Sequence, residues 1–228
     1  MKIAILGAMA EEITPLLEKL DHYETINYAN NRYYCGNYHG HELVIAHSKI
    51  GKVFASLTTM VMIEHFGVDL VLFSGVAGGV ADEVKVGDLV VAVDTAQHDV
   101  DITAFGYEHG FIPLSKTKVT TCPNLLSVAK EAAQHLNIEI KSGTIATGDQ
   151  FIHDVVKKEF IKTTFNAVAL EMEGGSVNLI CHEMGIPCLI LRAISDTADG
   201  GACDDFPAFV EMAANRSAVF IFAVIDLL

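Results

Sequence analysis

Several kinds of residue are scarce in this sequence, and each shortage argues against a class of protein. The 228 residues include no tryptophan, five prolines and five cysteines, and only 19% of them are charged. The cysteines are odd in number and form no CxxC pair; they are Cys35, Cys122, Cys181, Cys188 and Cys203. We therefore expect reduced thiols, as in cytoplasmic proteins, rather than a disulfide framework or a zinc site.

Positive charge and long apolar runs are also scarce. The formal net charge is −14, so nucleic acids and anionic membranes are poor partners. No apolar run reaches the roughly 18–20 residues that cross a bilayer, and the run over 218–225 ends at Asp226. Residues 1–7 lack a long apolar segment and a cleavage site, which indicates a first strand rather than a signal peptide. We expect a cytoplasmic protein.

The sequence does contain a regular alternation of apolar strands and helices. Hydrophobic residues make up 51% of the chain, enough for a large core in one domain over residues 1–228. This alternation is typical of an α/β layered fold with a parallel or mixed central sheet. Strands are expected at 2–6, 25–28, 32–38, 43–46, 69–73, 88–93, 138–146, 168–170 and 188–191, and helices from 10 onwards and at 51–65, 124–136, 154–164, 176–184 and 206–227.

Three segments between these elements carry further expectations. Apolar residues of the segment 51–65, among them Val53 and Leu57, recur with a period of 3.6 residues, which predicts the helix there. The small residues at 74–79 predict a turn that lets a ligand approach the backbone. The polar, aromatic and glycine-containing segment 97–113 predicts a long functional loop.

The stretch over 168–196 organises the rest of the chain. An apolar strand runs into Glu171-Met172-Glu173, a helix follows, and a second apolar strand runs into Asp196. In open α/β sheets, ligands bind at the C-terminal ends of strands. A carboxylate there is costly to bury unless it meets a partner or a ligand. Glu173 and Asp196 are therefore candidate site residues.

Glu12 is a third acid at a junction between a strand and a helix. Taken singly, each of the three acids is more often a helix N-terminal residue favoured by the helix dipole than a catalyst. Three together, in a chain poor in charge, point to a site. Met9, Met172, Phe105, Phe111, Phe151 and Phe206 lie beside the polar candidates, and an apolar site for a flat base needs such residues, although most residues of these types simply form core.

Other motifs are weaker. The segment 75–79 has the spacing of neither a dinucleotide-binding loop nor a Walker loop, and GxSxG is absent. His98-Asp99-Val100-Asp101 has metal-ligand residue types, but no second cluster matches it. A hydrogen-bonded histidine at a strand end is the better interpretation of His98, and we expect no metal.

Taken together, the motifs resemble those of the 5′-methylthioadenosine/S-adenosylhomocysteine nucleosidase family, within the nucleoside phosphorylase superfamily. The similarity runs nearly end to end. It implies a three-layer α/β/α sandwich around a mixed, barrel-like twisted sheet, a homodimer, and no metal or organic cofactor. The matching stretches are GAMAEE (7–12), SKIGKV (48–53), GVAGG (75–79), HDVDITAFGY (98–107), GDQFI (148–152), EMEG (171–174) and RAISD (192–196).

The resemblance also implies roles for individual residues. Asp196 would protonate adenine at N7, and Glu12 would hold and activate the attacking water. Glu173 would bind the ribose hydroxyls, with Met172 against the sugar. The remaining substrate-binding residues would be Phe151 and Ile152 at the base; Val76, Arg192 and Ser195 in the matching motifs; Met9, Ile50, Ile102, Phe105 and Phe206 around the 5′ substituent; and Tyr107 and Pro113 from the partner subunit.

Val76 stands where many family members carry a serine that can reach the ribose. Together with Phe73-Ser74, His98 and Gln150, it resembles the branch of the family that also hydrolyses 6-amino-6-deoxyfutalosine in menaquinone synthesis. We therefore hypothesise a substrate range of 5′-substituted adenine nucleosides, including 5′-methylthioadenosine, S-adenosylhomocysteine, 5′-deoxyadenosine and this compound.

Two alternatives remain at this point. A purine nucleoside phosphorylase would use phosphate as its nucleophile, but Glu11 and Glu12 stand where a phosphate site needs cations, and the chain has only three arginines. A non-catalytic nucleoside sensor would bind without turnover, which leaves the three acids unexplained. Cleavage of an N-ribosidic bond builds positive charge on the sugar and negative charge on the base, so it needs both an acid and an anion.

Overall fold

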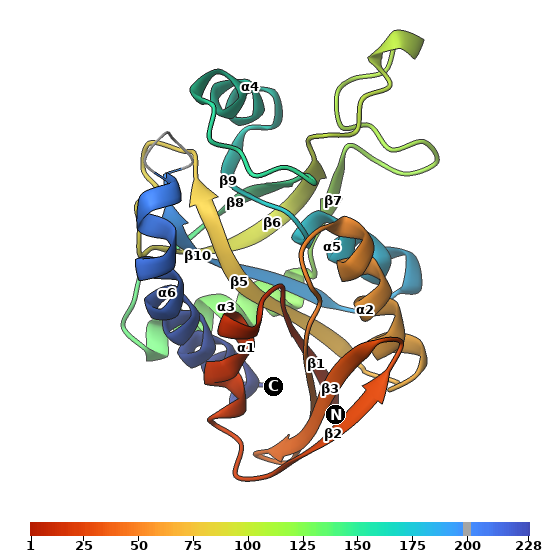
Figure 1. Cartoon of the computed structure of the whole chain (residues 1–228), viewed down its shortest axis with the longest axis vertical. Helices are drawn as coiled ribbons and strands as arrows, with labels where there is room; N and C mark the ends of the chain where they lie inside the picture. Colours follow the sequence, from red (N-terminus) through yellow and green to blue (C-terminus); the bar gives the residue numbers. More distant parts are fainter. Residues whose placement is uncertain (198–201) are drawn as a thin grey trace.

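The computed structural model describes residues 1–197 and 202–228. Its strands belong to one sheet (Figure 1). They are β1 (Lys2–Gly7), β2 (Tyr23–Tyr28), β3 (Asn31–Tyr38), β4 (His41–His47), β5 (Leu70–Gly79), β6 (Leu89–Gln97), β7 (Lys118–Thr120), β8 (Ile140–Thr147), β9 (Ala167–Glu171) and β10 (Cys188–Asp196). The helices are α1 (Ala10–Leu17), α2 (Lys52–Glu64), α3 (Pro123–His135), α4 (Val155–Phe165), α5 (Gly174–Met184), α6 (Ala202–Ile225) and the 3₁₀ turn η1 (Thr103–Phe105).

The sheet closes on itself at one end. Its strand order is β10-β6-β8-β9-β5-β1-β4-β3-β2, and β10 also pairs with β5, so β10, β6, β8, β9 and β5 form a ring. The pairing is mixed: β5–β10, β1–β5, β1–β4, β6–β8 and β8–β9 are parallel, whereas β6–β10 and β5–β9 are antiparallel. The predicted mixed, barrel-like sheet is confirmed.

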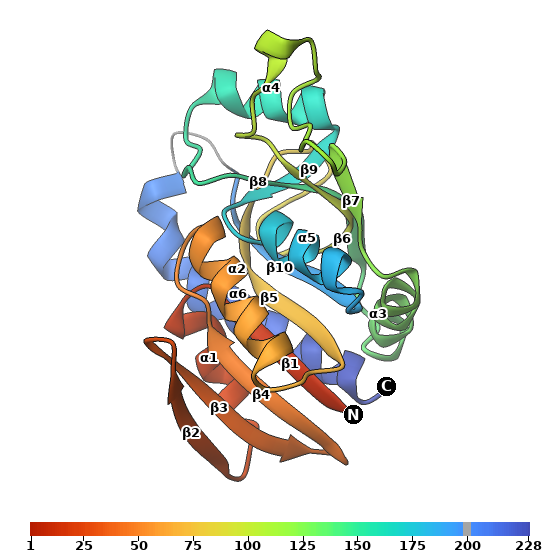
Figure 2. The same cartoon turned by 90° about the vertical axis from the view of Figure 1, so that its right-hand side faces the viewer.

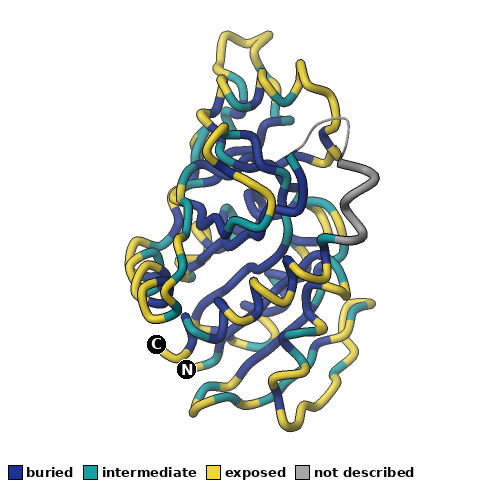
Figure 3. Tube along the Cα trace, turned by 90° about the vertical axis from the view of Figure 1, so that its left-hand side faces the viewer, coloured by how far each residue is buried: buried dark blue, intermediate teal, exposed yellow. Residues whose placement is uncertain are grey.

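Helices cover both faces of the sheet (Figures 1 and 2). Alternate residues of each central strand enter different cores, because successive side chains of a strand point to opposite faces. Ile3 and Ile5 of β1 pack in the core under α1, α3 and α6. Ala4 and Leu6 pack in the core under α2 and α5. Every residue of β10 is buried, which explains its nearly continuous apolar sequence. Figure 3 shows buried residues through the interior of the fold and exposed residues around its outside.

In three places the structure departs from the predicted elements. The segment expected to turn at 74–79 continues β5, because small side chains let this strand pass close to its neighbours. The short strand β7, which pairs with β6, was not predicted. The last helix begins at Ala202 rather than near Phe206. The side chain of Phe206 itself lies outside the described residues.

Helix α2 is confirmed, but part of its apolar period faces away from the core. Val53 is 78% exposed and Leu57 47% exposed, whereas Ala55 and Met62 are fully buried. The segment from 98 to 117, between β6 and β7, extends from the body of the protein, and Phe105 is 80% exposed there (Figure 1). These two features leave large apolar side chains in contact with solvent.

Two of the negative expectations can be compared with the described part of the chain. Within it, no helix combines the length and apolarity that crossing a membrane requires. Four of the cysteines are free thiols, namely Cys35, Cys122, Cys181 and Cys188. The fifth, Cys203, has a side chain outside the described residues.

Candidate active site

The three predicted acids meet in one cavity of about 370 Å³. Glu12 lies in the first turn of α1, Glu173 precedes α5, and Asp196 ends β10. All three are buried, with exposed fractions of 3%, 5% and 7%. The cavity is lined by Ala8, Met9, Glu12, Ile50, Val76, Ala77, Gly78, Phe151, Leu170, Glu171, Met172, Glu173, Ser195 and Asp196.

Three backbone N–H groups hold the Glu12 carboxylate. Its Oε2 accepts hydrogen bonds from Ala8 N at 2.5 Å and Met9 N at 2.9 Å, and its Oε1 accepts one from Val76 N at 2.9 Å. The bond to Met9 is half of a capping box, since Glu12 occupies the third position of the helix. Burial raises the pKa of Glu12, whereas Arg192 and the backbone donors oppose that rise. The carboxylate is thus fixed in direction and tuned toward a higher pKa, which suits a general base.

Gly75 of β5 makes room for this carboxylate. A Cβ at Gly75 would lie 2.7 Å from Glu12 Oε1 and 3.3 Å from Arg192 Nη1. Contacts below 3.0 Å do not occur for real Cβ atoms, and here the opposing oxygen is already held by Val76 N. The glycine therefore permits close approach of the carboxylate to the strand, rather than the turn expected from the sequence.

Glu173 is oriented from two sides. Its backbone carbonyl accepts hydrogen bonds from the first turn of α5, and its Oε1 accepts one from Gly51 N at 2.8 Å. Gly51 has a φ of +97°, a conformation that favours glycine, and it directly precedes α2. Burial and the nearby Glu171 raise the pKa of Glu173 to about 8, against the effects of Gly51 N–H and Arg192. The free carboxylate face can meet ligand hydroxyls.

A β-bulge sets the direction of Asp196. In the pairing of β10 with β5, Ile194 faces Ala77 and Asp196 faces Gly78, so Ser195 is the extra residue. Bulges next to active sites re-aim side chains in this way. Ser195 Oγ donates a hydrogen bond to Asp196 Oδ2 at 2.9 Å and approaches Ala77 O at 3.4 Å. The serine therefore orients the acid.

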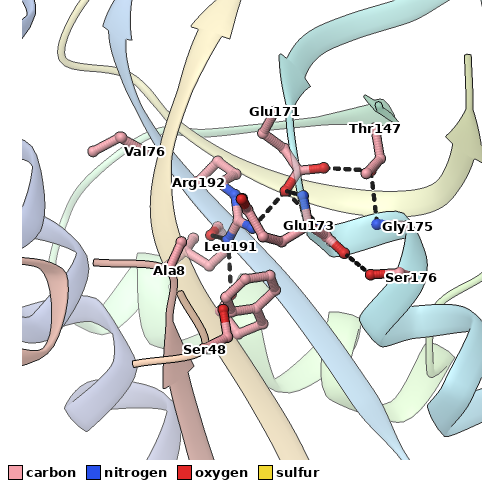
Figure 4. A network of polar contacts seen from close by, with 12 residues as sticks. Ala8, Ser48, Val76, Thr147, Glu171, Glu173, Gly175, Ser176, Leu191 and Arg192 are labelled. Carbon is pink, nitrogen blue, oxygen red and sulfur yellow. Dashed lines mark hydrogen bonds and ion pairs between the residues drawn. The ribbon is translucent and has the colours of Figure 1, made fainter. Parts of the chain in front are cut away.

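The acid beneath these groups, Glu171, was not assigned a role from sequence. Its Oε2 accepts hydrogen bonds from Arg192 Nη2 at 2.7 Å, Glu173 N at 3.0 Å and Gly174 N at 2.6 Å. Its other oxygen accepts one from Thr147 Oγ1, and Figure 4 shows this network. The only hint in the sequence is that Glu171 precedes Glu173 by two residues on an apolar strand.

Arg192 supports the site from behind. Its side chain is 1% exposed and stacks over the Phe73 ring, with Cζ 4.0 Å from the ring centroid. It lines neither the main cavity nor a small adjoining one. The expected contact of Arg192 with substrate therefore needs correction: burial against Phe73 and pairing with Glu171 make it a positioning residue.

An ion pair ties α2 to the loop after β6. Lys52 Nζ lies 2.6 Å from Asp99 Oδ1, and Asp99 Oδ2 accepts a hydrogen bond from Asp149 N at 2.9 Å. Burial works to raise the pKa of Asp99, but the bonds from Lys52 and Asp149 outweigh it and the pKa is lowered.

His98 is buried, and its Nε2 has no hydrogen-bond partner among the described residues. The expectation of a fully hydrogen-bonded histidine is therefore wrong.

The small adjoining cavity, of about 40 Å³, extends the site between Phe151 and Asp196. Gln150, Phe151 and Ile152 line it on one side, and Gly78, Leu170, Glu171, Met172 and Asp196 line the other. Phe151 is 48% exposed and lines both cavities. A purine between this ring and Asp196 would place its edge against a carboxyl group.

The loop residues predicted for the site lie apart from it in this chain. Phe105 and Tyr107 are 80% and 50% exposed, Pro113 is exposed and Ile102 is half-buried. None of the four lines the cavity of its own chain. The structure thus brings together Glu12, Glu173, Asp196, Met9, Ile50, Val76, Met172, Ser195, Phe151 and Ile152.

Metal chemistry has no candidate ligand set in this site. Among the side chains that the structure describes, which exclude those of residues 198–208, no group of three or more histidine, cysteine, aspartate or glutamate residues is arranged to hold a metal ion. The acids of the cavity are held by backbone N–H groups, Ser195 and Arg192 instead. The arrangement provides buried carboxyl groups in fixed orientations, which can act as acids or bases.

The fold and the site define a class. A family model described as the phosphorylase superfamily matches residues 2–226. The chain belongs to this superfamily. Its closed ring of strands is the barrel-like sheet that the resemblance predicted.

Individual relatives narrow the comparison. An aminodeoxyfutalosine nucleosidase from Campylobacter jejuni is 53% identical over 97% of this chain and 96% of its own. A 5′-methylthioadenosine/S-adenosylhomocysteine nucleosidase from Anoxybacillus flavithermus is 37% identical over 97% and 96% of the two chains. A Helicobacter pylori enzyme of the latter name, complexed with a pyrrolidine-based ligand, superimposes with a TM-score of 0.98 at 48% identity, covering 100% and 99%.

Proposed function

We propose that this protein is a nucleosidase that hydrolyses the N-ribosidic bond of 5′-substituted adenine nucleosides, releasing adenine and the 5′-substituted ribose. One observation carries the proposal: Glu12, Glu173 and Asp196 converge, buried and oriented, on a single cavity. The names of the similar nucleosidases support the same reaction.

Each acid has a distinct role in this reaction. Asp196 protonates the purine as the bond breaks, and Ser195 holds the carboxyl in position. Glu12 binds the attacking water and accepts its proton, since three N–H donors fix the carboxylate and leave the second lone pair of Oε1 available. This division of labour follows inverting glycoside hydrolysis, in which one carboxyl acts as acid and the other activates water.

Glu173 and its neighbours hold the sugar and the base. The Glu173 oxygen that does not accept from Gly51 is available to the ribose hydroxyls, and Met172 lies beside it. Phe151 offers a ring face for the adenine, and Ile152 lines the small cavity at its edge. Val76 carries no hydroxyl, so the ribose contact that a serine supplies in other family members is absent here.

Phosphate is a poor nucleophile for this site. No lysine or arginine is among the described residues that line the cavity, and the nearby Arg192 is already paired with Glu171. Glu12 would repel an anion at the position of the nucleophile and favours neutral water. A phosphorylase reaction is therefore not supported by the charge distribution.

Release of adenine from 5′-methylthioadenosine, measured by liquid chromatography with and without phosphate, tests the proposal. We expect equal rates and the free 5′-methylthioribose as product. A rate that requires phosphate, or a sugar phosphate as product, would identify a phosphorylase. Binding without any release of adenine would identify a sensor module.

The substrate range extends to aminodeoxyfutalosine. The relative from Campylobacter jejuni carries this activity in its name, and Ile50, which lines the cavity, is 54% exposed. Values of kcat/KM for aminodeoxyfutalosine, 5′-methylthioadenosine and S-adenosylhomocysteine decide the range. A lack of turnover with aminodeoxyfutalosine would exclude this compound from the substrate range.

The working form is a cytoplasmic homodimer in which Tyr107 and Pro113, on the loop between β6 and β7, complete the 5′ pocket of the partner subunit. Exposed apolar side chains on α2 and on this loop support the dimer, because such side chains mark protein interfaces. Free thiols are typical of a reducing compartment such as the cytoplasm. Sedimentation of the wild type and of Leu57→Asp tests the dimer, and a monomeric wild type at micromolar concentration would exclude it.

A further inference from the structure

A larger cavity, of about 650 Å³, lies on the other side of α1 from α6. One face of α1, the turn between β2 and β3, and the end of β4 enclose it. Ala29 and Asn30 have φ values of 47° and 57°, so the turn is tight and its polar residues are held at the cavity. The lining residues are Ala10, Ile13, Thr14, Leu17, Asn27, Tyr28, Ala29, Asn30, Asn31, Arg32, Tyr34, His47 and Lys49.

This larger cavity, which is called the basic cavity from here on, shares a wall with the active-site cavity. Met9 lines the active site and Ala10 lines the basic cavity, while Ile50 and Lys49 divide in the same way. Consecutive Cα atoms are about 3.8 Å apart, so the wall is one backbone thick. Ala10 is exposed and Ile50 is 54% exposed, so the backbone segments that separate the two cavities reach the protein surface. Lys49 is therefore the residue next to Ile50 in the chain, and Ile50 is an exposed lining residue of the active-site cavity.

Positive charge is concentrated in the basic cavity, although the chain as a whole carries −14. Arg32, His47 and Lys49 line it, and no aspartate or glutamate is among its lining residues. In the described part of the chain, neither Arg32 nor Lys49 has an acidic ion-pair partner. Lys49 Nζ instead donates to Asn30 O at 3.0 Å and lies 5.1 Å from the centroid of the Phe54 ring.

The other groups of the cavity suit an organic anion. Burial lowers the pKa of His47, and Lys49 and Arg32 lower it further against the opposing charge of the nearby Glu11, so the two long cations are the principal charges among the lining residues. Asn31 Nδ2 is anchored to His47 O at 2.9 Å, which fixes the turn against β4. Tyr28 and Tyr34 add aromatic surface beside the cations. Arginine and lysine so placed are the usual partners of carboxylates.

We propose that the basic cavity is a subsite for a carboxylate at the far end of the 5′ substituent, with Arg32 and Lys49 as its specificity-determining residues. The inference rests on the proposed nucleosidase function. S-Adenosylhomocysteine ends in an amino-acid carboxylate, and aminodeoxyfutalosine ends in an aromatic carboxylate. 5′-Methylthioadenosine ends in a methyl group and cannot use the subsite.

Selectivity between substrates tests the subsite. In Arg32→Gln and Lys49→Gln, kcat/KM for S-adenosylhomocysteine and aminodeoxyfutalosine should fall about tenfold, through KM, while the value for 5′-methylthioadenosine changes less than about twofold. A tenfold change corresponds to about 1.4 kcal/mol, which one charged hydrogen bond can supply. Arg216→Gln, an exposed arginine on α6 that lines neither cavity, removes the same charge and should leave the ratio of substrates unchanged.

Ionic strength and a competing anion provide the second measurement. Added salt should lower kcat/KM for the carboxylated substrates in the wild type and not in the double variant Arg32→Gln/Lys49→Gln. Inorganic phosphate that inhibits every substrate equally would assign the cavity to a free anion and overturn the 5′-carboxylate subsite. Equal losses for all substrates in the variants would overturn it too. No release of adenine from any substrate by the wild type would instead overturn the proposed function.

Discussion

Arg192 and Glu171 form a 2.7 Å ion pair beneath the candidate active site, with side-chain exposures of 1% and 2%. Glu171 also accepts hydrogen bonds from the backbone of Glu173 and Gly174, so the pair holds the start of α5. The Arg192 charge in turn opposes the rise in pKa of both Glu12 and Glu173. One buried cation thus affects the position or the charge of two candidate site acids.

Removal of the Arg192 cation should lower the free energy of unfolding. Arg192→Met leaves Glu171 buried without its charged partner, and breaking a buried pair in this way costs about 3–5 kcal/mol. Each kcal/mol corresponds to roughly 2–4 °C in Tm for a chain of this size. We expect a large fall in Tm by calorimetry, and a smaller one in the double variant Arg192→Met/Glu171→Leu. Equal Tm values for Arg192→Met and the wild type would show that the pair contributes nothing.

Substitution of Glu12 should abolish turnover and leave the fold intact. Glu12→Gln keeps the size and some hydrogen bonds of the side chain but cannot accept the proton of water. We expect kcat to fall by at least about 10²-fold. Glu11→Gln is the matched control, because Glu11 is the adjacent acid and is exposed. Near-normal adenine release by Glu12→Gln, or an equal loss in the control, would reject the assigned role.

Asp196 and Ser195 should separate into an acid and its positioning residue. Asp196→Asn removes the proton donor, and we expect a loss of about 10²–10⁴-fold in kcat with binding retained. Ser195→Ala removes the 2.9 Å bond to Oδ2 and the 3.4 Å contact with Ala77 O but keeps the acid, so a smaller loss and a shifted limb of the pH–rate profile are expected. Rates measured across pH test both variants. An unchanged pH profile in Ser195→Ala would reject the positioning role.

Glu173 should make the empty protein less stable as the pH rises. Its carboxyl ionises near 4.5 when unperturbed and near 8 in the fold. Between these values the folded state binds more protons than the unfolded state, so the free energy of unfolding falls with increasing pH. The stabilisation is complete below about pH 4.5 and lost above about pH 8. Glu12, whose pKa is also raised, adds to the same slope.

Thermal unfolding at constant ionic strength measures this slope. Tm of the wild type should fall between pH 6 and 8.5, and Glu173→Gln should fall less steeply because its side chain cannot titrate. Glu159→Gln, an exposed substitution on α4, is the control and should keep the slope of the wild type. Parallel slopes for Glu173→Gln and the wild type would contradict the prediction.

Much of this site could be predicted from sequence because the relevant signals are local. Glu12 and Asp196 lie at the C-terminal ends of β1 and β10, which both run parallel to β5, so these two acids share an edge of the sheet. Strand β9, which precedes Glu173, runs antiparallel to β5, so the approach of Glu173 to them depends on the closure of the ring. Helix α2 was recognisable from its 3.6-residue period. The apolar character of Val53 and Leu57 did not show whether these side chains face the core or the solvent. A 3.6-residue period identifies one face of a helix but not the part of the protein that packs against it.

Other features depend on contacts between distant segments. The bulge at Ser195 arises from the register of β10 on β5, which no local pattern encodes. The same holds for Arg192, whose motif suggested substrate contact but whose partner is Glu171 on β9. The basic cavity brings residue 14 of α1 to residues 32 and 49, and only the packed structure shows that their charges gather.

Gly75 has a consequence for the evolution and redesign of this scaffold. The Glu12 carboxylate occupies the volume that a methyl group on β5 would fill, at 2.7 Å from its Oε1. The first helix and the fifth strand are therefore not independent modules, and neither can be exchanged without the other. A library that varies the nucleoside pocket has to keep these two segments as one inherited unit.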